Sequence, residues 1–197
     1  MAKQSEIKYS RLMEKAEELF VKLGYKAVSM DEIAEAAGIS KMTIYKHFPS
    51  KEELFIAVVF SIMERSSDFI EGEMEKIHGS LEKIDYLMKY NMEVSKDYSI
   101  AFYKDAMSIP YITEKLMEEK YRISRRMFEG IIRTGIEKGE IRKVDVSFVT
   151  DMLLMIVGAF GEKYAKYFNS REDLEETIGK FYDFLKYGLL GRDGVKE

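Results

Sequence analysis

Apolar residues recur along most of the chain at the spacing of three and four that is typical of an α-helix. The first such stripe begins at Leu12 and ends before Gly24, a residue that commonly terminates helices. No segment alternates between apolar and polar residues as a half-buried strand would, so the pattern predicts an all-α fold. Further helices are expected over 51–76, 81–97, 99–107, 111–138, 145–168 and 171–188.

Capping residues divide the first fifty residues into three short helices. Ser29 precedes an acid-rich turn and is followed three residues later by Glu32, the arrangement of a capping box. A third helix begins at Ser40 after only a Gly-Ile turn. Such a tight turn between two helices indicates a helix-turn-helix unit. We therefore expect a three-helix DNA-binding domain over residues 1–50 and a larger helical ligand-binding and dimerisation domain over residues 51–197.

Charge is distributed unevenly along the chain. The formal net charge of −4 argues against non-specific binding of polyanions by the whole surface. From Gly38 to Lys51, however, there are three lysines, one histidine and no acid. A basic window within an acidic protein favours an oriented contact with DNA. A solvated lysine surface is the alternative that the charge pattern leaves open.

The third helix, over residues 40–48, has an outward face that suits the major groove. At about 100° per residue, Ile44 and Phe48 share one face and are expected in the core. Met42 and Lys46 point away from that face. The outward face is therefore short, polar and basic, with one apolar tip able to meet a thymine methyl group.

The segment from Ser29 to Leu54 reads Ser-x-x-x-Ile-Ala-x-x-Ala-Gly-Ile-Ser-Lys-x-Thr-Ile-Tyr-x-His-Phe-Pro-Ser-Lys-Glu-Glu-Leu. This pattern strongly resembles the tetracycline-repressor (TetR) family, and the match extends over about residues 8–55. The resemblance implies three DNA-binding helices followed by a helical domain for a ligand and a second subunit. It also implies that Tyr45 and Lys51 contact phosphates. The full set of expected DNA contacts is Ser29, Ser40, Lys41, Met42, Thr43, Tyr45, Lys46, His47 and Lys51.

The segment from Met152 to Gly161 is apolar on all sides, so its helix must be buried on more than one side. A single-domain core or a second subunit can provide that burial. The resemblance implies that this helix and the next, helices 8 and 9, form a four-helix homodimer interface. The expected apolar stripe of helix 9 consists of Leu174, Ile178, Phe181, Tyr182 and Leu185.

The middle helices are rich in methionine and aromatic residues, and methionine is frequent at surfaces that adapt to different ligands. Plain core packing is the alternative for the apolar members of this group. Asn91 needs hydrogen-bond partners if it is buried, and either a ligand or a neighbouring helix can supply them. The residues expected to bind a small-molecule effector are Met63, Met88, Asn91, Met92, Phe102, Tyr103, Met107 and Tyr121.

Together these features favour a transcriptional repressor that binds a palindromic double-stranded DNA operator as a dimer and is released by a small lipophilic or amphiphilic ligand. An all-helical enzyme is the competing class, but the chain has no cysteine and only two histidines. A DNA-binding protein without a ligand is the third possibility. No cofactor, metal or membrane partner is expected. Because no segment reaches the roughly 20 apolar residues of a membrane span, we expect a cytoplasmic protein.

Overall fold

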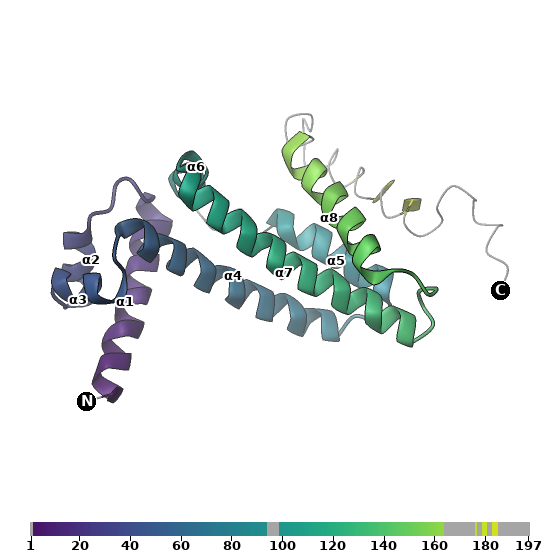
Figure 1. The fold of residues 1–197 in the computed structure, drawn as a ribbon, viewed down its shortest axis with the longest axis horizontal. Helices are drawn as coiled ribbons and strands as arrows, with labels where there is room; N and C mark the ends of the chain where they lie inside the picture. The colour runs from purple at the N-terminus through teal and green to yellow at the C-terminus, as the bar shows by residue number, and fades with distance from the viewer. Residues whose placement is uncertain (1, 94–98, 164–175, 177–178, 181–182, 185–197) are drawn as a thin grey trace. The chain divides into compact units, whose positions relative to one another are not determined.

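The structure, a computed structural model, describes residues 2–93, 99–163, 176, 179–180 and 183–184. These residues contain helices and no strand, which confirms the all-α prediction. The helices are α1 (Ala2–Leu23), α2 (Met30–Ala37), α3 (Lys41–His47), α4 (Lys51–Glu75), α5 (Ser80–Glu93), α6 (Ile100–Ser108), α7 (Pro110–Glu137) and α8 (Val146–Lys163) (Figure 1).

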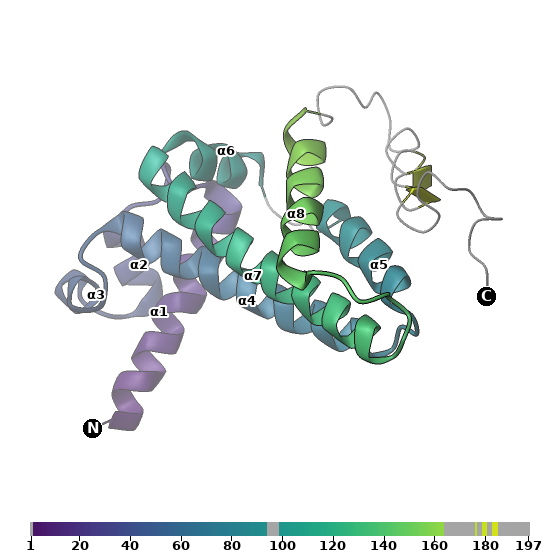
Figure 2. The same cartoon turned by 45° about the vertical axis from the view of Figure 1, so that its right-hand side comes forward.

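The helix ends predicted from α4 onwards lie within one residue of the observed ends wherever the chain is described. Figure 2 shows the same helices from a second direction. No helix in the described part of the chain is long and apolar enough to cross a membrane. The predicted stripe of helix 9, consisting of Leu174, Ile178, Phe181, Tyr182 and Leu185, lies outside the described residues.

The chain forms two compact units. The first unit combines Met1–Asp68 with Ser95–Tyr121, and the second combines Phe69–Val94 with Arg122–Glu197. Helices α4 and α7 each contribute residues to both units. The predicted domain boundary after residue 50 coincides with the start of α4, and the division of function at that boundary remains a prediction.

The first unit has a core to which α1, α2, α3, α4, α6 and α7 all contribute. Most of the predicted stripe of α1 is buried, since Leu12 and Phe20 are both fully inaccessible to solvent, but its last residue, Leu23, is 41% exposed. Phe55 of α4 lies at the centre of an aromatic cluster. Its ring centroid is 5.0 Å from that of Phe20, 5.3 Å from that of Tyr25 and 5.5 Å from that of Phe102.

In the second unit, the start of α5 is capped by a residue from a distant part of the chain. The backbone N–H and the hydroxyl of Ser80 donate to Glu140 Oε2 over 2.8 and 2.7 Å. These hydrogen bonds hold the pKa of Glu140 below its ordinary value, the hydroxyl contributing most and the backbone N–H next. A carboxylate at this position satisfies a backbone donor that the first turn of α5 cannot pair internally.

Gly135 of α7 lies close to this cap. A Cβ atom at Gly135 would lie 2.5 Å from Ser80 Oγ and 2.7 Å from Ile141 Cδ1, closer than real Cβ contacts. Glycine is therefore required here by the close approach of α7 to the start of α5.

We expect Gly135→Ala to destabilise the protein by about 1–3 kcal/mol, because the added methyl group overpacks a filled site. Gly130→Ala is the matched control in the same helix, since a Cβ there would meet no atom within 4 Å. The control should be neutral or should stabilise by about 0.5–1 kcal/mol through its better helix propensity. Chemical denaturation measures both changes. Equal stabilities of the two variants would contradict the close approach.

Candidate DNA-binding site

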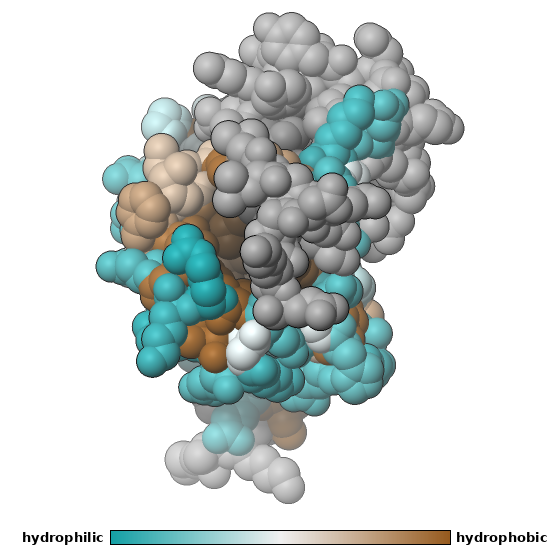
Figure 3. Space-filling view, turned by 90° about the vertical axis from the view of Figure 1, so that its right-hand side faces the viewer, coloured by the Kyte–Doolittle hydropathy of each residue, from teal (hydrophilic) through white to brown (hydrophobic). Residues whose placement is uncertain are grey.

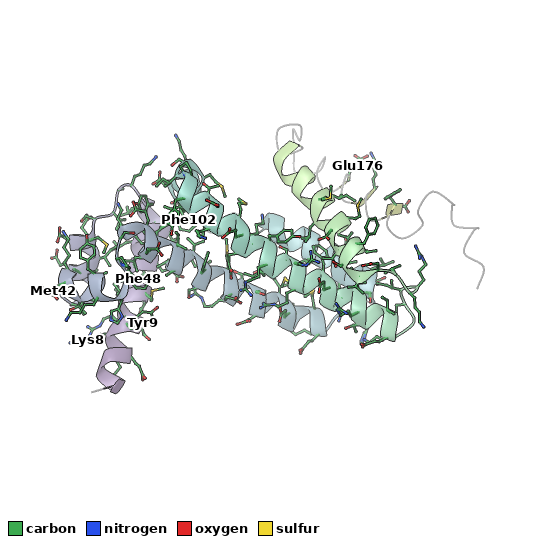
Figure 4. The ribbon with its side chains drawn as sticks, in the orientation of Figure 1. Lys8, Tyr9, Met42, Phe48, Phe102 and Glu176 are labelled. Carbon is green, nitrogen blue, oxygen red and sulfur yellow. The ribbon has the colours of Figure 1, made fainter. Side chains whose placement is uncertain are left out.

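Helix α3 is anchored by its inner face and exposes its outer face, as predicted. Ile44 is fully buried and Phe48 is 8% exposed, which confirms both as core anchors. Met42 is 71% exposed and Tyr45 is 44% exposed. Figure 4 shows that Met42 extends away from the helices of the first unit. The remaining outward positions, Lys41, Lys46 and His47, are also exposed.

Two of the predicted DNA contacts also fix the helix starts. The Ser29 hydroxyl accepts from the Glu32 N–H, and the Glu32 carboxylate accepts from the Ser29 N–H over 2.7 Å, which confirms the predicted capping box. The Ser40 hydroxyl accepts from the Thr43 N–H over 3.2 Å and lies 2.8 Å from the Thr43 hydroxyl. These caps hold α2 and α3 in register around Gly38, whose φ of 64° allows the tight turn.

Lys51 is the first residue of α4, and its side chain reaches the turn between α1 and α2. Its ammonium group donates to the carbonyls of Tyr25 and Val28 over 2.9 and 2.8 Å and lies 4.2 Å from the centroid of the Tyr25 ring. An ammonium group has three donors, so one remains for another partner. The predicted phosphate contact of Lys51 stays a prediction, and the observed role of the side chain is to fasten this turn to α4.

The same turn is held from α4 and α6 by carboxylates. The Tyr25 hydroxyl donates to Glu52 over 2.7 Å, and the Lys26 N–H donates to Asp105 of α6 over 2.8 Å. Burial, and then the hydrogen bond to Glu52, raise the pKa of Tyr25 well above its ordinary value. Gly24 is required here, because its φ is +84° and a Cβ would lie 2.8 Å from Asp105 Oδ2. Sequence reasoning missed Asp105, because nothing in the spacing of α6 indicates this contact.

Sequence reasoning also missed Tyr9, although its position in the helical pattern could have indicated that it packs against the neighbouring helices. It precedes Leu12 by three residues and so belongs to the same helical face of α1. Its ring centroid lies 5.4 Å from that of His47 and 6.0 Å from that of Phe48. Tyr9 therefore packs against the end of α3 and helps to orient the exposed face of that helix (Figure 4).

The second unit contains a cavity of about 320 Å³. Buried Met74, Met127 and Ile131 contribute apolar walls, and Lys83 and Arg126 are among the charged residues that line it. Arg126 forms an ion pair of 3.2 Å with Glu71, which also lines the cavity. The site thus combines an apolar interior with charged groups of both signs.

The predicted ligand-binding residues do not line this cavity where their side chains are described. Phe102 is buried in the core of the first unit, Met63 packs half-buried against that core, and Met107 and Tyr121 are 51% and 50% exposed. The side chains of Met88, Asn91, Met92 and Tyr103 lie outside the described residues. The predicted ligand contacts remain predictions.

Comparisons with known proteins agree with this architecture. Residues 12–58 match the family described as bacterial regulatory proteins, tetR family. The transcriptional activator FasR of Mycolicibacterium smegmatis is 27% identical over 147 residues, which is 71% of this chain and 66%, slightly under two thirds, of that protein. The fatty acid metabolism regulator protein of Bacillus subtilis is 27% identical over 161 residues, covering 77% of this chain and 80% of that protein.

A solved structure shows the same fold. The transcriptional regulator FadR from Bacillus subtilis, in complex with stearoyl-CoA, aligns with a TM-score of 0.64 and 20% sequence identity. The alignment covers 92% of this chain and 99% of that one. These similar proteins are transcriptional regulators, which confirms that the chain is not an enzyme. The capped helix-turn-helix and the exposed α3 face lie within residues 12–58, the segment that matches the tetR family of bacterial regulatory proteins, and the chain is a DNA-binding transcriptional regulator similar to FasR and to the Bacillus subtilis regulator.

Proposed function

We propose that this regulator is a repressor that binds a palindromic operator as a homodimer and is released by an amphiphilic acyl compound. The observation that carries the proposal is the outward face of α3, where Met42 and Tyr45 project into solvent from a firmly anchored helix. A helix presented in this way fits the major groove, where side chains can reach base edges. Two such helices related by a two-fold axis need matching half-sites about one helical turn, ~34 Å, apart.

Selection from a random pool of duplexes tests operator binding. We expect the recovered sequences to be palindromic. In the recovered operator, Met42→Ala or Lys46→Ala should relax the preference at particular base pairs, with a cost of about 1–3 kcal/mol at each. Binding is measured on the operator and on a scrambled duplex of the same composition. Equal losses on both duplexes would contradict a role for these residues in sequence choice.

Helix α8 supports the proposed dimer through helices 8 and 9. Phe148, Met152 and Met155 are 64%, 40% and 68% exposed and lie four and three residues apart, so that they share one helical face. Figure 3 shows hydrophobic residues at the surface of one face of the molecule. Contiguous exposed apolar surface of this kind is typical of a protein interface.

The cavity in the second unit supports an acyl ligand. Its volume of about 320 Å³ is at the lower end of the range of about 300–1,000 Å³ usual for small-molecule sites. Met74, Met127 and Ile131 can contact an alkyl chain, and the cations Lys83 and Arg126 can attract an acidic head group. The fatty acid metabolism regulator of Bacillus subtilis and the stearoyl-CoA complex of FadR are consistent with this chemistry.

Release requires that the ligand bind more tightly to the state that does not bind the operator. By reciprocity, the operator must then weaken ligand binding by the same factor, and a coupling of about 1–3 kcal/mol suffices for a switch. Titrating fatty acids and acyl-CoA esters of increasing chain length against free and operator-bound protein measures this coupling. Identical affinities in both states would exclude the role of inducer and favour a DNA-binding protein without ligand control.

A transcription assay decides the sign of regulation. Because FasR is named an activator, repression by this chain is part of the proposal. We expect transcription from a promoter that overlaps the operator to fall when the protein is added and to recover with the ligand. Stimulation by the ligand-free protein would make it an activator. The cytoplasmic location expected from the sequence remains a prediction.

A further inference from the structure

We propose that the first turns of α1 form an additional DNA-binding surface, on which Lys8 and Arg11 contact backbone phosphates beside the groove that α3 enters. This inference rests on the proposed operator binding and extends it to residues outside the helix-turn-helix. It assigns these cations to the DNA interface, whereas the sequence pattern placed that interface between residues 29 and 51.

Several lysines in and near the helix-turn-helix are already engaged within the protein. Lys41 forms an ion pair of 2.9 Å with Asp31, and Lys51 donates to two backbone carbonyls. Lys26 donates to the hydroxyl of Ser108 over 3.0 Å. Phosphate contacts supply a large part of the affinity of DNA-binding proteins. Cations that remain available near α3 are therefore the first candidates for such contacts.

Lys8 and Arg11 meet this requirement. Both side chains are exposed, and neither makes an ion pair or hydrogen bond within the described part of the chain. They are three residues apart and share one face of α1. The nearby acid Glu6 projects about 160° around the helix axis from Lys8.

The first turns of α1 lie against both ends of α3. Tyr9, next to Lys8, packs on His47 with a centroid distance of 5.4 Å. On another side of α1, Nη1 of Arg11 lies 3.6 Å from the position that a Cβ of Gly38 would occupy. Gly38 is in the turn before α3 and His47 is the last residue of α3. Arg11 therefore lies near the turn before α3, and Lys8 is next to the residue that packs on the end of α3.

The helix also has the length to reach past α3. It begins ten residues before Leu12, the first residue of its buried stripe, which corresponds to about 15 Å of helix. Figures 1 and 2 both show the N-terminal turns of α1 extending beyond α2 and α3. In Figure 4, Lys8 leaves α1 toward the side on which Met42 is exposed. A duplex bound by Met42 therefore comes within reach of Lys8.

The salt dependence of binding tests this surface. The full chain, the double variant Lys8→Gln/Arg11→Gln and the control Lys22→Gln are titrated with the selected operator and with its scrambled form over a range of salt concentrations. Lys22 is an exposed cation at the opposite end of α1. Each lost phosphate contact should lower the slope of log K against log salt by ~0.9. We expect a decrease of ~1.8 for the double variant on both duplexes and no change for the control.

A charge-preserving variant, Lys8→Arg/Arg11→Lys, separates the effect of charge from the effect of folding. It should keep the wild-type slope, and thermal melting should show the same helical transition in all four proteins. An unchanged slope in the glutamine double variant would overturn the proposal. An equal decrease in the Lys22 control or in the charge-preserving variant would also overturn it. Failure of the wild-type chain to bind any duplex would instead refute the proposed function itself.

Discussion

Replacing Phe55 by alanine will destabilise the protein by about 3–5 kcal/mol, the usual cost of removing a fully buried phenylalanine. Phe55 is completely inaccessible to solvent, and its ring meets those of Phe20, Tyr25 and Phe102. Each of these aromatic pairs adds about 0.5–1.5 kcal/mol beyond the area that it buries. The cavity left behind would weaken the packing of α4 against α1 and α6. Because this packing positions the DNA-binding helices, we also expect weaker DNA binding at 37 °C.

Phe69→Ala is the matched control for this prediction. Phe69 lies in the same helix but is 55% exposed, with a single tilted ring contact to Tyr90 at 6.0 Å. Its replacement should cost about 1 kcal/mol or less. Urea denaturation followed by circular dichroism compares the two variants with the wild type. A Phe55→Ala protein as stable as Phe69→Ala would show that the aromatic cluster does not hold the first unit together.

Met155→Asp will convert the proposed dimer into monomers and abolish operator binding at concentrations where the wild type saturates. Met155 is 68% exposed in the single chain and lies in the apolar stripe of α8. In a two-fold interface the substitution would bury two unpaired carboxylates, and each costs several kcal/mol. We therefore expect the dissociation constant of the dimer to rise by about 100-fold or more.

The test is sedimentation of the variant beside Met117→Asp. Met117 is also exposed, at 41%, but belongs to α7. The control should sediment like the wild type. A Met155→Asp variant that remains dimeric would exclude the exposed face of α8 from the interface. A wild-type protein that sediments as a monomer would exclude the dimer altogether.

Sequence reasoning predicted the helix-turn-helix well because its determinants are local. The capping box of Ser29 and Glu32 spans three residues, and the buried position of Ile44 follows from helical periodicity alone. The exposure of Met42 follows from the same periodicity. Tyr9 could have been added on this basis, since it continues the stripe that begins at Leu12.

The contacts that hold these local elements together could not be predicted in the same way. Asp105 and Lys26 are separated by 79 positions, and Glu140 and Ser80 by 60. Periodicity assigns such residues to an exposed or buried face but does not indicate which partner they meet. The ligand site was difficult for another reason. Phe102 and Met127 both belong to apolar positions of helices, and helical periodicity cannot tell that Phe102 packs in a core whereas Met127 lines a cavity.

The hydrogen bond from the Lys26 backbone to Asp105 has a consequence for the local unfolding of the first unit. The amide hydrogen of Lys26 can exchange with solvent only when this bond opens, and its acceptor belongs to α6 rather than to the helix-turn-helix. The backbone N–H of Ser99, just before α6, also donates to the carbonyl of Val21 near the end of α1. Hydrogen exchange should therefore report α6 and the turn after α1 as one cooperative unit, with a shared opening free energy. Any event that loosens α6 will then appear first as faster deuterium uptake at Lys26, before α2 or α3 has lost a single hydrogen bond.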